Sequence, residues 1–246
     1  MPRAEAALAR EMKRERSTET GAILRLVKDG PAMHFQPIVD LEGGRRTAVE
    51  ALARFPASEP RAWFERAAKV GLSVELELAC VRSALAHLDR LPGDVLLSIN
   101  ASAQTAATDE FAELIAGVEH RIIIELTEHV PIEDYRQLKQ RLGLYRERGA
   151  RIAVDDLGAG YASLRHLLRL DPDIVKLDVS LTRELETDPR AQALTAALVE
   201  LGALVGASVT AEGIETESEL ALLRGLGVRE GQGYYLGSPD ELEPPG

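Results

Sequence analysis

Short apolar runs rich in β-branched residues recur along the whole chain, and each is bounded by polar or turn-forming residues. An uninterrupted run such as Ile122-Ile123-Ile124 is typical of a parallel strand that is buried on both faces. We predict strands over Met33–Leu41, Thr47–Phe55, Val95–Ala101, Arg121–Glu128, Arg151–Asp156, Ile174–Val179, Ser208–Ile214 and Gly231–Leu236.

Apolar residues at helical spacing lie between most of these runs. The clearest repeat follows Asp188-Pro189, a pair typical of a helix start, and consists of Leu194, Leu198, Leu201 and Val205. Further helices are predicted over Trp63–Val70, Val74–Leu88 and Tyr135–Tyr145, with glycines at positions that end helices, Gly71 and Gly149.

Strands that alternate with helices indicate a (β/α)8 barrel. One connection differs, because only Glu42-Gly43-Gly44 separates the first two runs, and a parallel pair needs a crossover of about a dozen residues. We therefore predict an α/β fold, a modified TIM (β/α)8 barrel with one antiparallel strand. Residues 1–30 are expected to form a charged helical extension, 31–240 the barrel domain and 241–246 a flexible tail.

Composition and charge narrow the class of protein. The apolar fraction of 45% and the charged fraction of 28% are ordinary for a globular domain. The single cysteine, Cys80, excludes an internal disulfide, and the net charge of −11 disfavours binding to duplex nucleic acid. The chain has neither a signal-peptide pattern nor the ~20 apolar residues that cross a bilayer, so we predict a cytoplasmic protein with no membrane insertion.

Polar residues follow or end nearly every predicted strand, and in a barrel the carboxyl ends of the strands meet at one face. These residues are Glu50, Asn100, Glu125, Asp155 with Asp156, Lys176 with Asp178, Glu212 and Gln232. So many carboxylates cannot stay ionised side by side without compensating charge, which two divalent cations would supply. Oxygen ligands favour Mg²⁺ or Mn²⁺, and two such ions a few ångströms apart suit phosphoester displacement.

Each of these residues also has an ordinary structural interpretation. An acid at the end of a strand more often caps the next helix than it binds a metal, and Lys176 alone could be an ion-pair partner. Helix caps, however, do not require that every strand contributes a polar residue. The array across seven strands is therefore what favours a functional site.

The same residues occur in motifs that resemble the EAL domain family, from about Met33 to Pro239. The motifs, all in the order that the family has, are Phe35-Gln36-Pro37-Ile38-Val39-Asp40, Glu50-Ala51-Leu52, Ser98-Ile99-Asn100-Ala101-Ser102, Glu125-Leu126-Thr127-Glu128, Asp155-Asp156-Leu157-Gly158-Ala159-Gly160, Lys176-Leu177-Asp178, Ala211-Glu212-Gly213-Ile214-Glu215-Thr216 and Gln232-Gly233-Tyr234. The resemblance implies a hydrolase that opens cyclic di-GMP to linear pGpG with two Mg²⁺ or Mn²⁺ ions.

The resemblance also implies a role for each matching residue. The metal ligands would be Glu50, Asn100, Glu125, Asp155, Asp156 and Glu212. Glu212 would also act as general base, and Lys176 would hold or polarise the attacking water with support from Asp178 and Gln232. Arg54 would pair with a substrate phosphate, for which its planar fork is suited, and Gln36 would contact the nucleotide. Glu128 and Glu215 would brace the loop after Asp156, which in this family leads to a dimer interface, so a homodimer is implied.

The chain departs from the commoner family pattern in the loop after the fifth strand. Leu157 and Ala159 stand where the family more often has phenylalanine and threonine, while both acids and both glycines are kept. We expect this change to affect the stiffness of the loop and its coupling to a dimer, and not metal binding.

Two other functions compete with the phosphodiesterase. A catalytically silent cyclic di-GMP receptor or interaction module would be expected to have lost a metal ligand or the lysine, and all are present. A barrel enzyme that forms a Schiff base on Lys176 would leave the carboxylates unexplained. Sensitivity to a chelator separates the second alternative from the phosphodiesterase.

Overall fold

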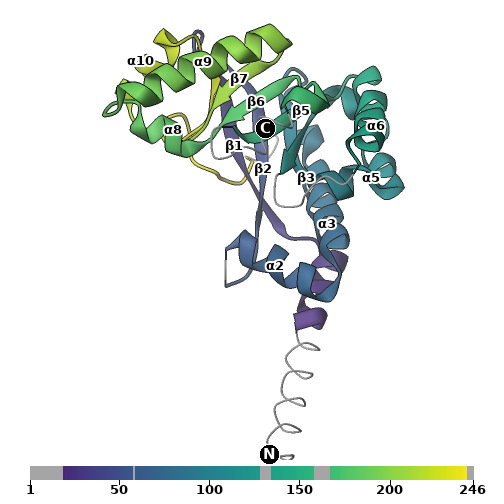
Figure 1. The fold of residues 1–246 in the computed structure, drawn as a ribbon. Helices are drawn as coiled ribbons and strands as arrows, with labels where there is room; N and C mark the ends of the chain where they lie inside the picture. Colours follow the sequence, from purple (N-terminus) through teal and green to yellow (C-terminus); the bar gives the residue numbers. More distant parts are fainter. Residues whose placement is uncertain (1–18, 58, 128–133, 158–166, 243–246) are drawn as a thin grey trace, which may run out of the picture.

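A computed structural model describes residues 19–57, 59–127, 134–157 and 167–242, apart from the side chain of Asp156. Within these residues a single closed barrel is formed by β1 (Ala32–Asp40), β2 (Arg46–Arg54), β3 (Leu96–Ser102), β4 (Ile122–Thr127), β5 (Arg151–Leu157), β6 (Ile174–Leu177), β7 (Ser208–Ala211) and β8 (Glu230–Gly231) (Figure 1). The predictions for Glu128, for residues 1–18 and for residues 243–246 fall outside the described residues.

The predicted reversed strand is β1, which runs antiparallel to both β2 and β8, while the other neighbouring pairs are parallel. The hairpin turn forms because the Asp40 carboxylate accepts a hydrogen bond from the Gly43 N–H at 2.8 Å and Gly44 takes a positive φ of 67°. The modified TIM barrel with one antiparallel strand is confirmed. Figure 1 shows β1 and β2 continuing beyond the barrel toward α2 and α3.

Helices connect and cover the strands (Figure 1). They are α2 (Pro60–Val70), α3 (Ser73–Leu85), α4 (Ala103–Ala106), α5 (Asp109–Leu114), α6 (Tyr135–Glu147), α8 (Val179–Glu184), α9 (Pro189–Val205) and α10 (Glu217–Gly225), with 3-10 turns at Leu88–Arg90 and Glu119–Arg121. Residues 19–29 and 167–170 are also helical. No described helix is long and apolar enough to cross a membrane.

The predicted helix signals act as expected. The Asp188 carboxylate accepts from the Arg190 N–H at 2.8 Å at the start of α9, and Pro189 occupies the first turn. Gly71 ends α2 in the left-handed conformation with φ 76°. The structure adds a helix that was not predicted, α10, which starts with a complete capping box between Thr216 and Glu219.

The hydrophobic core lies mostly between the strands and the surrounding helices. Outward-facing residues such as Leu97 and Ile99 on β3 are fully buried against these helices. The helix at 19–29 joins the fold through Ile23, which is fully buried in a cluster with Trp63 and Leu76. At the other end Leu242 packs against the main core, so the described chain stays attached to the barrel to its last described residue.

The inside of the barrel is filled by a separate apolar layer. It consists of one residue from each of the first six strands, namely Ile38, Ala48, Leu96, Ile123, Ala153 and Ile174. Side chains alternate between the two faces of a strand, so the residue two positions further toward the barrel mouth also points inward. This layer therefore forms an apolar floor beneath those next inward-pointing residues.

Three strands end earlier than predicted. Strand β6 ends at Leu177 and not at Val179, because Val179 begins α8. The last strand is Glu230–Gly231 and does not extend to Leu236, because residues after Gln232 form a turn in which the N–H groups of Leu236 and Gly237 both bond to the Gly233 carbonyl. Strand β7 ends at Ala211 and not at Ile214. Both segments instead exchange backbone hydrogen bonds just above the barrel, from Ile214 N–H to the Gln232 carbonyl at 3.1 Å.

Gly233 is essential for this turn, because a Cβ there would lie 2.2 Å from both the N and the O of Ile214. We predict that Gly233→Ala destabilises the protein by about 1–3 kcal/mol, since backbone atoms must shift to accept the methyl group. Urea or thermal denaturation followed by circular dichroism measures the change.

Gly143→Ala is the matched control, because Gly143 lies inside α6 and a Cβ there meets nothing within 4 Å. It should stabilise the protein by about 0.5–1 kcal/mol through helix propensity. Equal effects of the two substitutions would contradict the role assigned to Gly233.

Candidate active site at the mouth of the barrel

A polar layer lies directly above the apolar floor of the barrel. Each of the first six strands contributes the inward residue two positions from its floor position, and β7 and β8 are each followed directly by a residue of the layer. The layer consists of Gln36, Glu50, Ser98, Glu125, Asp155, Lys176, Glu212 and Gln232. The fold thus gathers one residue from, or directly after, each of the eight strands: seven that the sequence predicted, and Ser98, which the sequence did not indicate.

Lys176 stands at the centre of this layer, with its side chain 2% exposed. Its Nζ lies 2.6 Å from Glu212, 2.8 Å from Glu125, 3.1 Å from Glu50 and 3.9 Å from Asp155, measured to the nearest carboxylate oxygen. The carboxylates differ in access to solvent: Glu125 is 1% exposed, whereas Asp155 and Glu212 are 20% and 21% exposed. One ammonium therefore faces four carboxylates, two of which open to the mouth of the barrel.

Neutral side chains hold the Glu50 carboxylate on both sides. The Asn100 amide donates to Oε1 at 2.8 Å, and the Gln232 amide donates to Oε2 at 2.7 Å. Gln232 also donates to Gln36 at 2.9 Å, and Gln36 donates to the Gly237 carbonyl at 3.1 Å. This chain of hydrogen bonds links Glu50 to the turn after β8, so the turn and the site are fixed to each other.

Glu125 is held in a similar way. The Ser98 hydroxyl donates to Oε1 at 2.5 Å, and Lys176 donates to Oε2 at 2.8 Å. Ser98 is fully buried on the inner face of β3, the face that also carries Asn100. The alternation of a strand was the signal that could have identified Ser98, since it lies two residues before Asn100.

The electrostatics of the layer follow from burial and from the excess of acids. Burial by itself would lower the pKa of Lys176, but the surrounding carboxylates, Glu125 and Glu212 foremost, raise it well above its usual range. Burial would raise the pKa of Glu50, but the Lys176 ammonium and the two amide hydrogen bonds outweigh it and hold that pKa below its usual value. Lys176 and Glu50 are therefore both charged at neutral pH.

Glu125 and Glu212 are not both fully charged at neutral pH. Burial, followed by the charge of Glu50, raises the pKa of Glu125 to about 8, although Lys176 partly offsets both. Burial raises the pKa of Glu212 to about 7, against the opposing effect of Lys176. The site as it stands carries more negative charge than its single lysine can balance.

The remaining predicted residues lie around the layer. Asp178 caps α8, with its carboxylate accepting from the Ser180 N–H at 3.0 Å. Arg54 is the last residue of β2, on the same strand face as Glu50 and half-buried. Glu215 pairs with Arg183 at 3.3 Å on the surface. Their predicted roles, like those of Glu128 and the Asp156 side chain outside the described residues, stay predictions.

The donor set suits a hard divalent cation, because the converging groups are carboxylate oxygens whose charge is not balanced. Their present positions suit the lysine. Among the described residues, which exclude the Asp156 side chain, no three His, Cys, Asp or Glu side chains are arranged to hold a metal ion. The chemistry of the residues thus fits a metal, while their oxygens now converge on the Lys176 ammonium.

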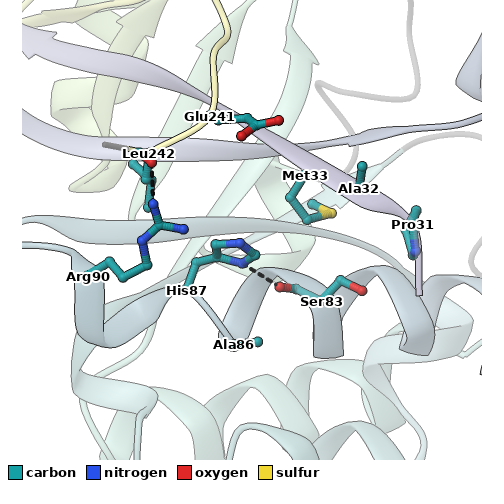
Figure 2. Close-up of a pocket in the computed structure, with 9 residues that line it drawn as sticks. All are labelled: Pro31, Ala32, Met33, Ser83, Ala86, His87, Arg90, Glu241 and Leu242. Atoms are coloured by element: carbon teal, nitrogen blue, oxygen red, sulfur yellow. Dashed lines mark hydrogen bonds between the residues drawn. The ribbon is translucent and has the colours of Figure 1, made fainter. Parts of the chain in front are cut away.

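A cavity of about 310 Å³ lies outside the barrel wall, between the start of β1, the end of α3 and residues 241–242 (Figure 2). His87 Nδ1 lies 2.9 Å from the Ser83 carbonyl beside it, and Arg90 donates to the carbonyl of Leu242. None of the predicted site residues lines this cavity, so it is distinct from the polar layer.

Residues 22–239 match the family model described as EAL domain, and the chain belongs to that family. It is 35% identical over 227 residues to the cyclic di-GMP phosphodiesterase PA2567 of Pseudomonas aeruginosa, an alignment that covers 86% of this chain and 39% of that protein. The chain therefore spans about two fifths of the length of this curated relative.

Solved structures show the same fold. The PaMucR phosphodiesterase in complex with c-di-GMP is 28% identical with a TM-score of 0.78, and the match covers 91% of this chain and 97% of that one. Klebsiella pneumoniae BlrP1, solved as a manganese and cyclic di-GMP complex, is 29% identical with a TM-score of 0.75, and the match covers 85% of this chain and 56% of that one.

The raised carboxyl pKa values predict how stability depends on pH in the absence of metal. Between the ordinary carboxyl pKa of 4.5 and about 8, the folded state binds more protons at Glu125 and Glu212 than the unfolded state does. Stability should therefore fall as pH rises through this window. In EDTA we expect the melting temperature to drop by several degrees from pH 6 to pH 9.

Glu125→Gln should flatten this pH dependence, because it removes the group that titrates at about 8. Glu184→Gln, on the exposed surface of α8, should leave the pH dependence unchanged and serves as control. Melting curves across pH check both, and the same slope in Glu125→Gln as in the wild type would contradict the assignment.

Proposed function

We propose that the chain is a metal-dependent phosphodiesterase that hydrolyses cyclic di-GMP to linear pGpG, with two Mg²⁺ or Mn²⁺ ions at the mouth of the barrel. The observation that carries the proposal is the convergence of four carboxylates on Lys176, in a chain that belongs to the EAL domain family. The names of PA2567 and PaMucR as phosphodiesterases, and the manganese complex of BlrP1, support it.

Side-chain oxygens at the mouth of the barrel would hold the ions. The proposed ligands are Glu50, Asn100, Glu125, Asp155, Asp156 and Glu212. When bound, the ions would supply the positive charge that these acids lack and would make water a better nucleophile at neutral pH. An anionic substrate in an acidic protein also requires such a local change of sign.

The side chains of the protein would position the reactants. Lys176 would hold the attacking water and stabilise charge on the phosphate, with Asp178 and Gln232 in support. Glu212 would accept the proton of the water, a role suited to a carboxyl with a pKa of about 7 and partial access to solvent. Arg54 would pair with a phosphate and Gln36 would contact the nucleotide.

The proposed reaction adds one water across one phosphodiester bond. The water oxygen bonds to phosphorus, the bond from phosphorus to one ribose oxygen breaks, and that oxygen receives a proton. The ring of cyclic di-GMP opens and the product is linear pGpG.

The same proposal includes a homodimer in the cytoplasm, in which Glu128 and Glu215 brace the loop after Asp156.

The alternative function is a silent cyclic di-GMP receptor or interaction module. One observation favours it: no three acids of the described residues are now arranged around a common position for a metal ion. A receptor would bind cyclic di-GMP without turnover, and its binding would be insensitive to a chelator.

The direct test is incubation of the purified chain with cyclic di-GMP and Mn²⁺ or Mg²⁺, with and without EDTA, followed by chromatography. We expect pGpG to form with metal and not with EDTA, and Glu50→Gln to lower turnover by at least about 100-fold because a charged metal ligand is lost. Glu184→Gln is the control for a surface carboxyl and should keep full turnover.

Binding of cyclic di-GMP without any product, in the presence of either metal ion, would contradict the phosphodiesterase function and favour the receptor function. Full turnover in Glu50→Gln would refute the assignment of Glu50 as a ligand. Circular dichroism of each variant shows whether the fold is kept.

Lys176→Met should separate turnover from binding. Removal of the ammonium should lower kcat by about 100-fold or more while the affinity for cyclic di-GMP changes much less, because the proposed role of Lys176 lies with the water and the developing charge. Steady-state kinetics and calorimetric binding measure the two quantities. Equal losses in both would argue against this role.

A further inference from the structure

We propose that Ser98 is a positioning residue that orients the Glu125 carboxylate for metal binding, an inference that rests on the proposed function. Ser98 is fully buried in the polar layer, and its hydroxyl donates to Glu125 Oε1 at 2.5 Å. The other oxygen of Glu125 accepts from Lys176 at 2.8 Å. Both oxygens of this buried acid are thus fixed by donors, one charged and one neutral.

Side chains of β3 donate hydrogen bonds to an acid on each of the two neighbouring strands. Strand β3 lies between β2 and β4, with Ser98 opposite Glu50 in one register and Asn100 opposite Glu125 in the other. Each side chain nevertheless bonds to the acid that is not directly opposite it: Asn100 donates to Glu50 at 2.8 Å, and Ser98 donates to Glu125. One strand therefore supplies a neutral donor to each of the two most buried carboxylates of the site.

Packing alone does not require a hydroxyl at this position. The floor beneath is filled by apolar side chains, with alanine at two of its six positions, Ala48 and Ala153. A small apolar residue at 98 would fill similar space, but Oε1 of Glu125 would then lose the hydrogen bond that fixes it. Neutral partners of metal-binding side chains typically change metal affinity by about 10–100-fold when they are removed.

The test is the affinity of the metal-stripped chain for Mn²⁺ by isothermal titration calorimetry, at one pH and without substrate. We expect Ser98→Ala to weaken Mn²⁺ binding by about 10–100-fold relative to the wild type. The control is Ser102→Ala, also on β3, where the buried hydroxyl caps α4 by accepting from the Thr105 N–H at 3.2 Å. It should lower the melting temperature and leave Mn²⁺ affinity unchanged.

Ser98→Cys covers the case in which Ser98→Ala does not fold, because a thiol keeps the bulk of the side chain and is only a weak donor. It should also weaken Mn²⁺ binding. Wild-type affinity in a folded Ser98 variant, or an equal loss in Ser102→Ala, would overturn the inference and leave the proposed function standing. Absence of Mn²⁺ binding in the wild type would instead overturn the proposed function itself.

Discussion

The buried ammonium of Lys176 among four carboxylates is the interaction on which the site depends. Charges are costly to bury unless they are paired and hydrogen-bonded, and Lys176 bonds to Glu50, Glu125 and Glu212 at 3.1 Å or less. The lysine makes it possible for these acids to lie at the centre of a barrel at all. Because it is a single charge, it leaves Glu125 and Glu212 with raised pKa values, and that imbalance is what a cation can relieve.

The barrel produces this cluster through its register. The strands bring an apolar floor to one level, and the next inward residues to the level above it. The floor keeps water from reaching the polar layer from below, so the electrostatic interactions there act in a medium of low polarity and are strong. The reversed strand β1 takes part in the same pattern, with Ile38 in the floor and Gln36 in the polar layer.

Neutral hydrogen-bond donors complete the arrangement. Gln232 joins Glu50 to Gln36 and through it to the turn after β8, whose close approach to Ile214 requires Gly233. Ser98 and Asn100 fix one oxygen each of Glu125 and Glu50. These hydrogen bonds give the acids defined orientations, which is the condition for preorganised binding and catalysis.

The sequence alone determined most of the fold and the chemical class of the site. Apolar runs separated by helical repeats indicated the strands, and the short Glu42-Gly43-Gly44 connection indicated the reversed one, because these signals are local. Tertiary structure decided which acids Lys176 contacts, how far their pKa values are displaced and that Ser98 belongs to the site, since each depends on side chains from different strands at one level. It also ended β8 at Gly231, because the contact between Gly233 and Ile214 joins segments that the sequence keeps apart.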